Sequence, residues 1–321
     1  MEYKPSEIRT LSMLGQRGAF GATLDKLAAG NDKIFALAAD VQNSAGLGRF
    51  AKNYPGRFAN VGIAEQNMVG IAAGLADAGY NVFAATFANF AALRANEFAK
   101  HFMGYMRSPV KLVGFGAGFG MGVLGYTHYG LEDVGALRPI SNINIVSPAD
   151  ALETVKAVET ISTLDEPVYL RLTGAANNPI VYKGDYEFRI GKAVKLQEGR
   201  NIALLAAGSM VHYALEAAKI LETHDVSCSV INMHTIKPLD ADAIDASLDA
   251  GLIVTVEEHR VAGGLGGAVA EYLARVKRKP PQRIIGIADG YPHAGGYSYM
   301  LDKAGLLPAQ LAQSILEEYK Q

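Results

Sequence analysis

The chain contains a single cysteine and no tryptophan among its 321 residues. One thiol cannot form a disulfide within the chain, so a disulfide-stabilised fold is excluded. Cys228 lies in the apolar run 226–231, which predicts a buried strand and a core thiol rather than a nucleophile. Because such a thiol suits a reducing compartment, we expect a cytoplasmic location.

The sequence has no strong charge of either sign and no long apolar run. Thirty basic and 32 acidic residues give a net charge of -2, which provides no broad basic surface for nucleic acid or an acidic membrane. No run approaches 18 apolar residues and the first residues are polar, so we predict neither a membrane span nor a signal peptide. The seven histidines show no metal-ligand spacing beside a carboxylate or cysteine, so we expect no metal held by this chain alone.

What the sequence has in abundance is glycine, with 35 residues, and alternating strand and helix patterns. Short apolar runs predict strands at 33–40, 57–61, 82–87, 109–115, 143–147, 168–172, 201–206, 226–232, 252–256 and 283–287. Helical spacing predicts helices at 8–29, 64–78, 91–106, 131–138, 148–162, 211–223, 240–249 and 265–277, and from residue 308. The first of these helices places Leu14 and Leu24 on its apolar face.

This alternation predicts an α/β protein with parallel sheets covered by helices on both faces. The segment 177–198 breaks the rhythm with turn-forming residues, and we place a domain boundary near residue 186. The predicted architecture is therefore two doubly wound domains, at 1–186 and 187–321.

The stretch Phe58–Leu75 holds one carboxylate, Glu65, among small and apolar residues. Burying a carboxylate costs several kcal/mol unless it is paired or protonated, so this position needs an explanation. One interpretation is a half-exposed residue in the first turn of a helix, stabilised there by the helix dipole. The other is a functional carboxylate.

Two glycine clusters follow predicted strands. The cluster at 114–125 matches neither the Gly-x-x-x-x-Gly-Lys-Ser/Thr pattern nor the Gly-x-Gly-x-x-Gly pattern of nucleotide-binding loops. It is therefore a weak signal for nucleotide binding. The cluster Gly263–Gly267 opens a helix, where close packing and anion binding are equally good interpretations. His128 lies just after the first cluster, at a strand end where side chains reach ligands.

Five motifs, in this order, resemble the transketolase family and span residues 10 to 310. They are Ile63-Ala-Glu-Gln-Asn-Met-Val-Gly-Ile-Ala72, Thr86-Phe-Ala-Asn-Phe90, Thr127-His-Tyr-Gly-Leu-Glu-Asp133, Thr235-Ile-Lys-Pro-Leu239, and Val256-Glu-Glu-His259 with the glycines that follow it. The resemblance implies a thiamine diphosphate fold: a pyrimidine-binding domain followed by the family's C-terminal domain.

The family's Gly-Asp-Gly motif, which with a later Asn holds the diphosphate and its metal, is missing from this chain. The resemblance therefore implies one subunit of a split transketolase. Thiamine diphosphate and Mg²⁺ (or Ca²⁺) would be shared with a separate N-terminal subunit that holds the diphosphate and metal, and the assembly would contain two copies of each subunit. The implied reaction transfers a two-carbon ketol unit between small sugars.

The resemblance also assigns site residues. Glu65 matches the carboxyl group that bonds a ring nitrogen of the aminopyrimidine and activates the cofactor, and apolar surroundings strengthen such a bond. Phe87 and Phe90 match the aromatic wall of the pyrimidine, and Asp40 matches a carboxylate near the thiazolium. His128 is implied as a catalytic and substrate-binding residue.

On the substrate side, Arg17 and Ser44 match residues that contact the sugar phosphate. Three positions depart from the family: Gly116 and Gly174 replace a phosphate-binding histidine and arginine, and Leu124 replaces an Asp that reads a donor hydroxyl. Leu93 stands where a further aromatic residue is common, which predicts looser packing around the pyrimidine. Since an arginine fork contributes strongly to phosphate binding, we expect a ketose with a differently placed phosphate or none.

Three other assignments stay open. A β-type subunit of a 2-oxo acid dehydrogenase has the same two domains, and a deoxyxylulose phosphate synthase-like enzyme is a further alternative. A catalytically silent scaffold subunit is the non-enzyme alternative, against which Glu65, Phe90 and His128 argue.

Overall fold

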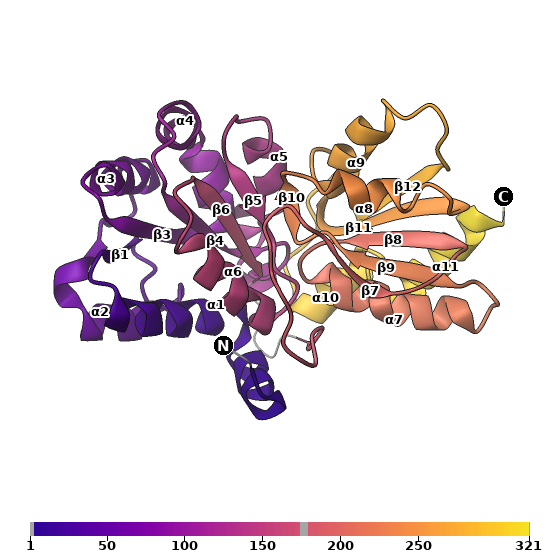
Figure 1. The fold of residues 1–321 in the computed structure, drawn as a ribbon, viewed down its shortest axis with the longest axis horizontal. Coiled ribbons are helices and arrows are strands. Elements are labelled where there is room, and N and C mark those ends of the chain that lie inside the picture. Colours follow the sequence, from indigo (N-terminus) through magenta and orange to yellow (C-terminus); the bar gives the residue numbers. More distant parts are fainter. Residues whose placement is uncertain (1–2, 174–178, 321) are drawn as a thin grey trace.

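The computed structural model describes residues 3–173 and 179–320, and it contains two sheets that lie side by side with helices on both faces (Figure 1). The first sheet has seven strands in the order β10-β5-β6-β4-β3-β1-β2, and the second has five in the order β12-β11-β8-β9-β7. The predicted fold class, two mainly parallel α/β domains, is confirmed. The boundary at residue 186 stays a prediction.

The first sheet is built from buried apolar runs, as the sequence predicts. Its strands are β1 (Ile34–Ala38), β2 (Phe58–Asn60), β3 (Asn81–Phe87), β4 (Lys111–Ala117), β5 (Asn144–Val146), β6 (Val168–Thr173) and β10 (Thr235–Lys237). All neighbouring strands pair in parallel except β10, which pairs antiparallel with β5. The sequence did not predict β10, a three-residue segment from the later half of the chain that completes the earlier sheet.

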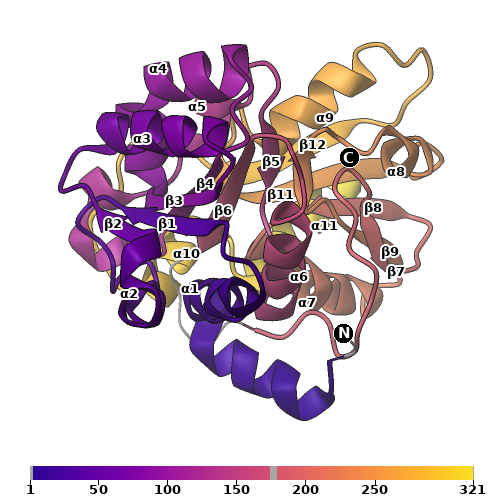
Figure 2. The ribbon, with the colours of Figure 1, turned by 60° about the vertical axis from the view of Figure 1, so that its left-hand side comes forward.

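Helices cover both faces of this sheet (Figures 1 and 2). One face carries α1 (Pro5–Gly30) and α6 (Ala151–Ile161), with α2 (Gly48–Asn53) and a 3₁₀ turn η1 (Pro55–Arg57) beside β2. The opposite face carries α3 (Glu65–Asp77), α4 (Asn96–Phe98) and α5 (Asp133–Leu137). Two further 3₁₀ turns, η4 (Gly122–Leu124) and η5 (Tyr126–His128), form the glycine loop after β4.

The first helix is broken where the sequence predicts continuity. Gly15 has φ 68°, a left-handed conformation that glycine adopts without strain, and the segment before it projects from the domain (Figure 2). As a result Leu14 is 49% exposed, whereas Leu24 is fully buried. The prediction of a single apolar face over 8–29 is therefore wrong at Leu14.

The predicted helix at 91–106 is mostly not an α-helix. It consists of the π-helical segments η2 (Phe90–Arg94) and η3 (Ala99–Tyr105), separated by the single α-helical turn of α4. The Ala95 N–H donates to the Phe90 carbonyl five residues earlier, at 3.2 Å. Such wide turns are rare and occur frequently at functional sites.

The second domain follows the predicted alternation, with two additions. Its strands are β7 (Val194–Gln197), β8 (Ile202–Ala206), β9 (Cys228–Asn232), β11 (Leu252–Arg260) and β12 (Gln282–Ile287). Its helices are α7 (Met210–Glu222), α8 (Ala241–Asp245), α9 (Leu265–Leu273), α10 (Tyr297–Lys303) and α11 (Pro308–Tyr319). The sequence did not predict β7 and α10. Cys228 is buried in β9, and burial raises the pKa of its thiol to about 12, which confirms a core role.

The glycine cluster at the start of α9 is a packing feature. The Glu257 carboxylate accepts hydrogen bonds from the backbone N–H groups of Leu265 and Gly266, at 2.7 and 2.8 Å. Burial raises the pKa of Glu257 to about 7. Since a side chain of the same molecule occupies these donors, the anion-binding interpretation of this cluster is wrong. Within the described ranges, no helix combines the length and apolarity that crossing a bilayer needs.

Candidate functional site

The candidate residues gather at the carboxyl ends of adjacent parallel strands. Asp40 follows β1, Glu65 follows β2 at the start of α3, and Phe87 ends β3. These three strands are neighbours in the sheet order β3-β1-β2, so their ends share one edge. In open α/β sheets this edge is where ligands bind.

Glu65 is buried, with 1% of its surface exposed, and is the first residue of α3. Its two carboxylate oxygens accept hydrogen bonds from Nη1 of Arg94, at 3.0 and 2.8 Å. The position at the helix N-terminus adds a favourable dipole. The interpretation of Glu65 as a half-exposed first-turn residue is therefore wrong, although it does lie in the first turn.

Sequence reasoning missed Arg94, the partner of Glu65. The Arg94 guanidinium carbon lies 4.3 Å from the centre of the Phe90 ring, while the side chain remains 39% exposed. Both residues belong to the π-helical segment η2 and lie four residues apart, a spacing that also places side chains on one face of an α-helix. The one signal in the sequence was a lone arginine in an otherwise apolar stretch beside the Phe87 and Phe90 motif.

Three predicted residues form one aromatic cluster. The ring of His128 lies 5.2 Å from Phe87 and 5.4 Å from Phe90, edge-on to both. Phe87 and Phe90 are 5.7 Å apart in the same geometry. Edge-to-face pairs of this kind are the favoured arrangement of aromatic rings. All three side chains are partly exposed, so the cluster forms a wall rather than a closed core.

The loop that carries His128 is fixed by polar contacts. The Asn89 side-chain amide donates to the Thr127 carbonyl at 2.8 Å, and the Thr127 hydroxyl lies 3.0 Å from Nδ1 of His128. Asn89 directly precedes Phe90 in the chain, so the same backbone segment supports the aromatic wall and the histidine.

The two predicted phosphate contacts also lie together. Nη1 of Arg17 donates to the backbone carbonyl of Ser44 at 3.0 Å, and its guanidinium lies 6.0 Å from the Phe115 ring. Phe115 in turn lies 4.6 Å from Phe87, which joins this pair to the aromatic cluster. Burial lowers the pKa of Arg17, whereas Ser44 is exposed.

Asp40 is held apart from this cluster. It has φ 57°, which is uncommon for a residue with a side chain, and its N–H donates to Oδ1 of Asn60 at 3.0 Å. Its carboxylate is exposed and, in the part of the chain that the structure describes, has no hydrogen bond or ion pair with Glu65 or His128.

The structure accounts for one of the three departures from the family pattern, the glycine at position 116. A side chain at Gly116 would begin 2.8 Å from Met121 and 3.4 Å from Phe87, in a backbone conformation of φ 71°. Met121 therefore fills the space that a histidine there would need. Leu124 is 51% exposed on the same glycine loop, and Gly174 lies outside the described residues.

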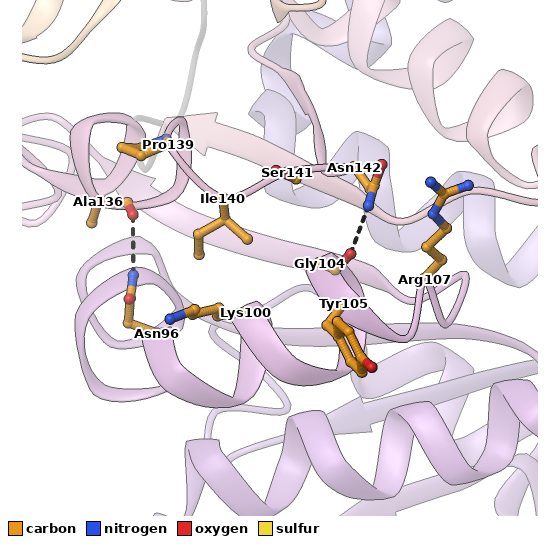
Figure 3. A pocket seen from close by; sticks show the side chains of 10 residues that line it. All are labelled: Asn96, Lys100, Gly104, Tyr105, Arg107, Ala136, Pro139, Ile140, Ser141 and Asn142. Carbon is orange, nitrogen blue, oxygen red and sulfur yellow. Dashed lines mark hydrogen bonds between the residues drawn. The ribbon is translucent and has the colours of Figure 1, made fainter.

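A cavity of about 740 Å³ lies elsewhere in the first domain (Figure 3). It lies between η3 and the segment that follows α5. Across it, the Asn96 amide donates a hydrogen bond to the Ala136 carbonyl, and the Asn142 amide donates one to the Gly104 carbonyl. Its walls precede β4 and β5, so it faces the amino ends of those strands. None of the residues that line it is Asp, Glu, His or Cys, so we place the candidate site at the other edge.

Fold and site together define a class: a two-domain α/β protein with a ligand site at the carboxyl edge of its larger sheet. Comparison with known proteins gives the family. Residues 12–177 match the model of the transketolase pyrimidine-binding domain, and residues 191–311 match the transketolase C-terminal domain. The chain therefore belongs to the transketolase family.

Relatives of similar length carry related descriptions. The chain is 40% identical to one of the subunits of the apulose-4-phosphate transketolase of Phocaeicola vulgatus, over 94% of this chain and 97% of that protein. It is 38% identical to a putative transketolase C-terminal section of Methanocaldococcus jannaschii, over 95% and 96%. A solved structure described as a split gene transketolase, inactive beta4 tetramer, superposes with a TM-score of 0.85 at 36% identity, over 95% of this chain and 98% of that one.

Proposed function

We propose that this chain is one subunit of a thiamine diphosphate-dependent transketolase that moves a two-carbon ketol unit between sugars. It is active only with a separate subunit that holds the diphosphate and a Mg²⁺ (or Ca²⁺) ion. The names of its relatives, one a transketolase subunit and the other a split gene transketolase, support a partner. We further propose two copies of each subunit in the assembly.

The observation that carries this proposal is a buried carboxylate beside an accessible aromatic wall. Glu65 offers lone pairs that its contact with Arg94 leaves free, and Phe90 offers a partly exposed ring. An aminopyrimidine needs a carboxylate for its ring nitrogen and a flat apolar surface for its face. The residues present therefore fit the pyrimidine half of the cofactor.

Each residue has a distinct role in this proposal. When bound, thiamine diphosphate would supply a nucleophilic carbon and the electron sink needed to cleave the C–C bond of the donor ketose and to form the new bond to the acceptor. Glu65 holds a proton shared with the ring nitrogen, and Phe90 and Phe87 orient the ring and exclude water from one side of it. His128 faces the sugar and exchanges a proton with its hydroxyl groups, a role that suits an imidazole near neutral pH.

For the substrate, we propose a ketose that is recognised without the usual phosphate clamp. A side chain at Gly116 has no room, and Leu124 offers no hydrogen-bond acceptor. Arg17 is the cation on the Phe115 side of the aromatic cluster, and it contacts Ser44. It can bind one anionic group at the far end of a sugar, so a phosphate placed away from the usual position remains compatible with the site.

The first prediction tests the split enzyme. The isolated chain is expected to show no turnover, because it lacks the Gly-Asp-Gly motif that holds the diphosphate. Mixing it with a partner chain that carries this motif, thiamine diphosphate and Mg²⁺ should give transfer between ketoses and aldoses. A coupled assay across sugars with and without phosphate measures the donor range.

Three outcomes would count against this proposal. Xylulose 5-phosphate as the best donor would show that the substrate inference is wrong. Decarboxylation of a 2-oxo acid without ketol transfer would favour one of the alternatives, a 2-oxo acid dehydrogenase subunit or a deoxyxylulose phosphate synthase-like enzyme. Absence of turnover with every donor, despite a stable complex, would favour a scaffold subunit.

The second prediction concerns Phe90. Replacing it by leucine keeps an apolar side chain but removes the ring face, which contributes about 1 kcal/mol beyond burial. We expect the Kd of thiamine diphosphate in the assembled enzyme to rise about fivefold, measured by calorimetry. Phe98→Leu, on the neighbouring turn α4, is the matched control and should leave the Kd unchanged. An unaltered Kd for the Phe90 variant would show that its ring does not contact the cofactor.

A further inference from the structure

The pairing of Glu65 with Arg94 resolves an electrostatic problem. An isolated carboxylate that is 1% exposed is strongly destabilised, and removing the partner of a buried ion pair is costly because the remaining charge loses its compensation. Arg94 is the sole cation bonded to Glu65 within the residues that the structure describes. It therefore supplies the charged hydrogen-bond donor that this buried carboxylate needs inside an apolar surround.

Arg94 also fixes geometry, because it touches both parts of the site. One of its nitrogens contacts both oxygens of Glu65, and its guanidinium lies on the Phe90 ring at 4.3 Å. Guanidinium groups stack on aromatic rings, and this contact adds to the charge-assisted hydrogen bonds. The carboxylate and the aromatic wall are thus held at a set separation by one side chain.

Leu93 and Arg94 are neighbours in η2 but have different surroundings. Leu93, at the position where an aromatic residue is common in the family, is 48% exposed. Arg94, one residue further on, covers Phe90 instead. The expectation of looser packing around the pyrimidine stays a prediction, and within this subunit the guanidinium packs against the Phe90 ring.

We propose that Arg94 is a positioning residue that presets Glu65 for the cofactor. It holds the Glu65 carboxyl group in place and turned toward the Phe90 wall before any cofactor arrives, so that binding does not have to order these groups. This proposal rests on the proposed function, because it takes the aminopyrimidine as the ligand of Glu65. The role is electrostatic and orientational, and Arg94 itself need not touch the substrate.

The test measures cofactor affinity in the assembled enzyme. Arg94→Gln removes the charge and the Nη1 donor that contacts both oxygens of Glu65, and we expect it to weaken thiamine diphosphate binding at least tenfold by calorimetry with Mg²⁺ present. Arg94→Lys retains the charge and should recover part of this loss. The matched control is Arg107→Gln, which removes an exposed arginine from the end of the same helical region and should leave the affinity unchanged.

A second measurement uses the isolated chain and no cofactor. Arg94→Gln should lower the midpoint of chemical unfolding because it leaves the Glu65 carboxylate buried without its partner. Adding Glu65→Gln to this variant removes the stranded charge and should restore most of the midpoint. This double-mutant cycle isolates the coupling between the two side chains.

The outcomes separate this proposal from the proposed function. A wild-type Kd of thiamine diphosphate in Arg94→Gln would overturn the positioning role. If the unfolding midpoint fell while this Kd stayed unchanged, the pair of Arg94 and Glu65 would be purely structural. A wild-type assembly that does not bind thiamine diphosphate at all would instead show that the proposed function is wrong. In that case the double-mutant cycle would still report whether the two residues are coupled.

Discussion

Replacing Glu65 by glutamine is expected to reduce turnover of the assembled enzyme at least about 100-fold, the lower end of what a positioned acid or base contributes. Glutamine has nearly the same shape, so it still fits beside Arg94 and Phe90. It carries no charge, however, and cannot hold a proton shared with a ring nitrogen as a carboxylate does. The loss should therefore appear in turnover more than in the fold.

Stability measurements separate a catalytic loss from misfolding. Arg94 is 39% exposed, so water can solvate its charge when Glu65 becomes neutral. We expect circular dichroism and the unfolding midpoint of Glu65→Gln to stay close to wild type. The matched control is Glu97→Gln, an exposed carboxylate on the nearby turn α4, which should retain full turnover. Near-normal turnover in Glu65→Gln would contradict the assignment of this residue.

The sequence predicted the sheet because strand burial is a local signal. Residues 34–39 are continuously apolar, as expected of a strand covered on both faces, and Ile34–Ala38 form β1. The three residues of β10 carry no such signal, because their pairing with β5 depends on a contact some 90 positions away along the chain. Tertiary pairing of this kind has no local pattern to read.

In the candidate site, too, the sequence predicted residues with a local signal and missed those that depend on tertiary contacts. Glu65 stands out because a carboxylate in an apolar stretch is unusual, and Phe90 lies in a short recognisable motif. Arg94 was missed because its partner Glu65 lies 29 residues earlier in the chain, and no local pattern pairs two residues at that separation. Asp40 matches a family position, yet its left-handed backbone and its contact with Asn60 become visible only in three dimensions.

One of the family motifs, Val256–His259, makes structural contacts in this chain. In β11, burial lowers the pKa of His259 to about 4, and its neutral ring accepts a hydrogen bond from the Gly135 N–H at 3.2 Å. The neighbouring Glu258 accepts from the Phe119 N–H, the Ser209 hydroxyl and the Tyr297 hydroxyl. This strand therefore binds the glycine loop of the first domain to the second domain.

Asp133 belongs to the same contact between the two domains, and this contact also supports the loop that carries His128. Its carboxylate accepts hydrogen bonds from Nε of Arg171 at 2.8 Å and from the Tyr169 hydroxyl at 2.7 Å. Arg171 in turn donates to the carbonyls of Gly130 and Glu258, both at 2.9 Å. One buried ion pair thus joins the sheet, the loop that carries His128 and the second domain.

Replacing Asp133 by alanine should destabilise the chain by about 3–5 kcal/mol, the cost of leaving one member of a buried ion pair without its partner. Arg171 is only 4% exposed in its side chain, so water cannot replace the lost carboxylate. The free energy of unfolding from urea titration measures this loss. The control, Asp242→Ala, removes a surface carboxylate that pairs with Lys192 and should change stability little.

The ion pair of Asp133 and Arg171 also predicts how the stability difference between wild type and Asp133→Ala depends on pH. Burial alone would raise the pKa of Asp133, but the charge and hydrogen bonds of Arg171 hold it below its usual range. A carboxyl group with a lowered pKa in the folded state stabilises the fold above its unfolded pKa and loses that contribution as the pH falls through the folded value. The advantage of wild type over Asp133→Ala should therefore persist at neutral pH and shrink in acid. An advantage that stayed constant down to strongly acidic pH would show that the ion pair is not its source, and packing around Asp133 would then explain the loss.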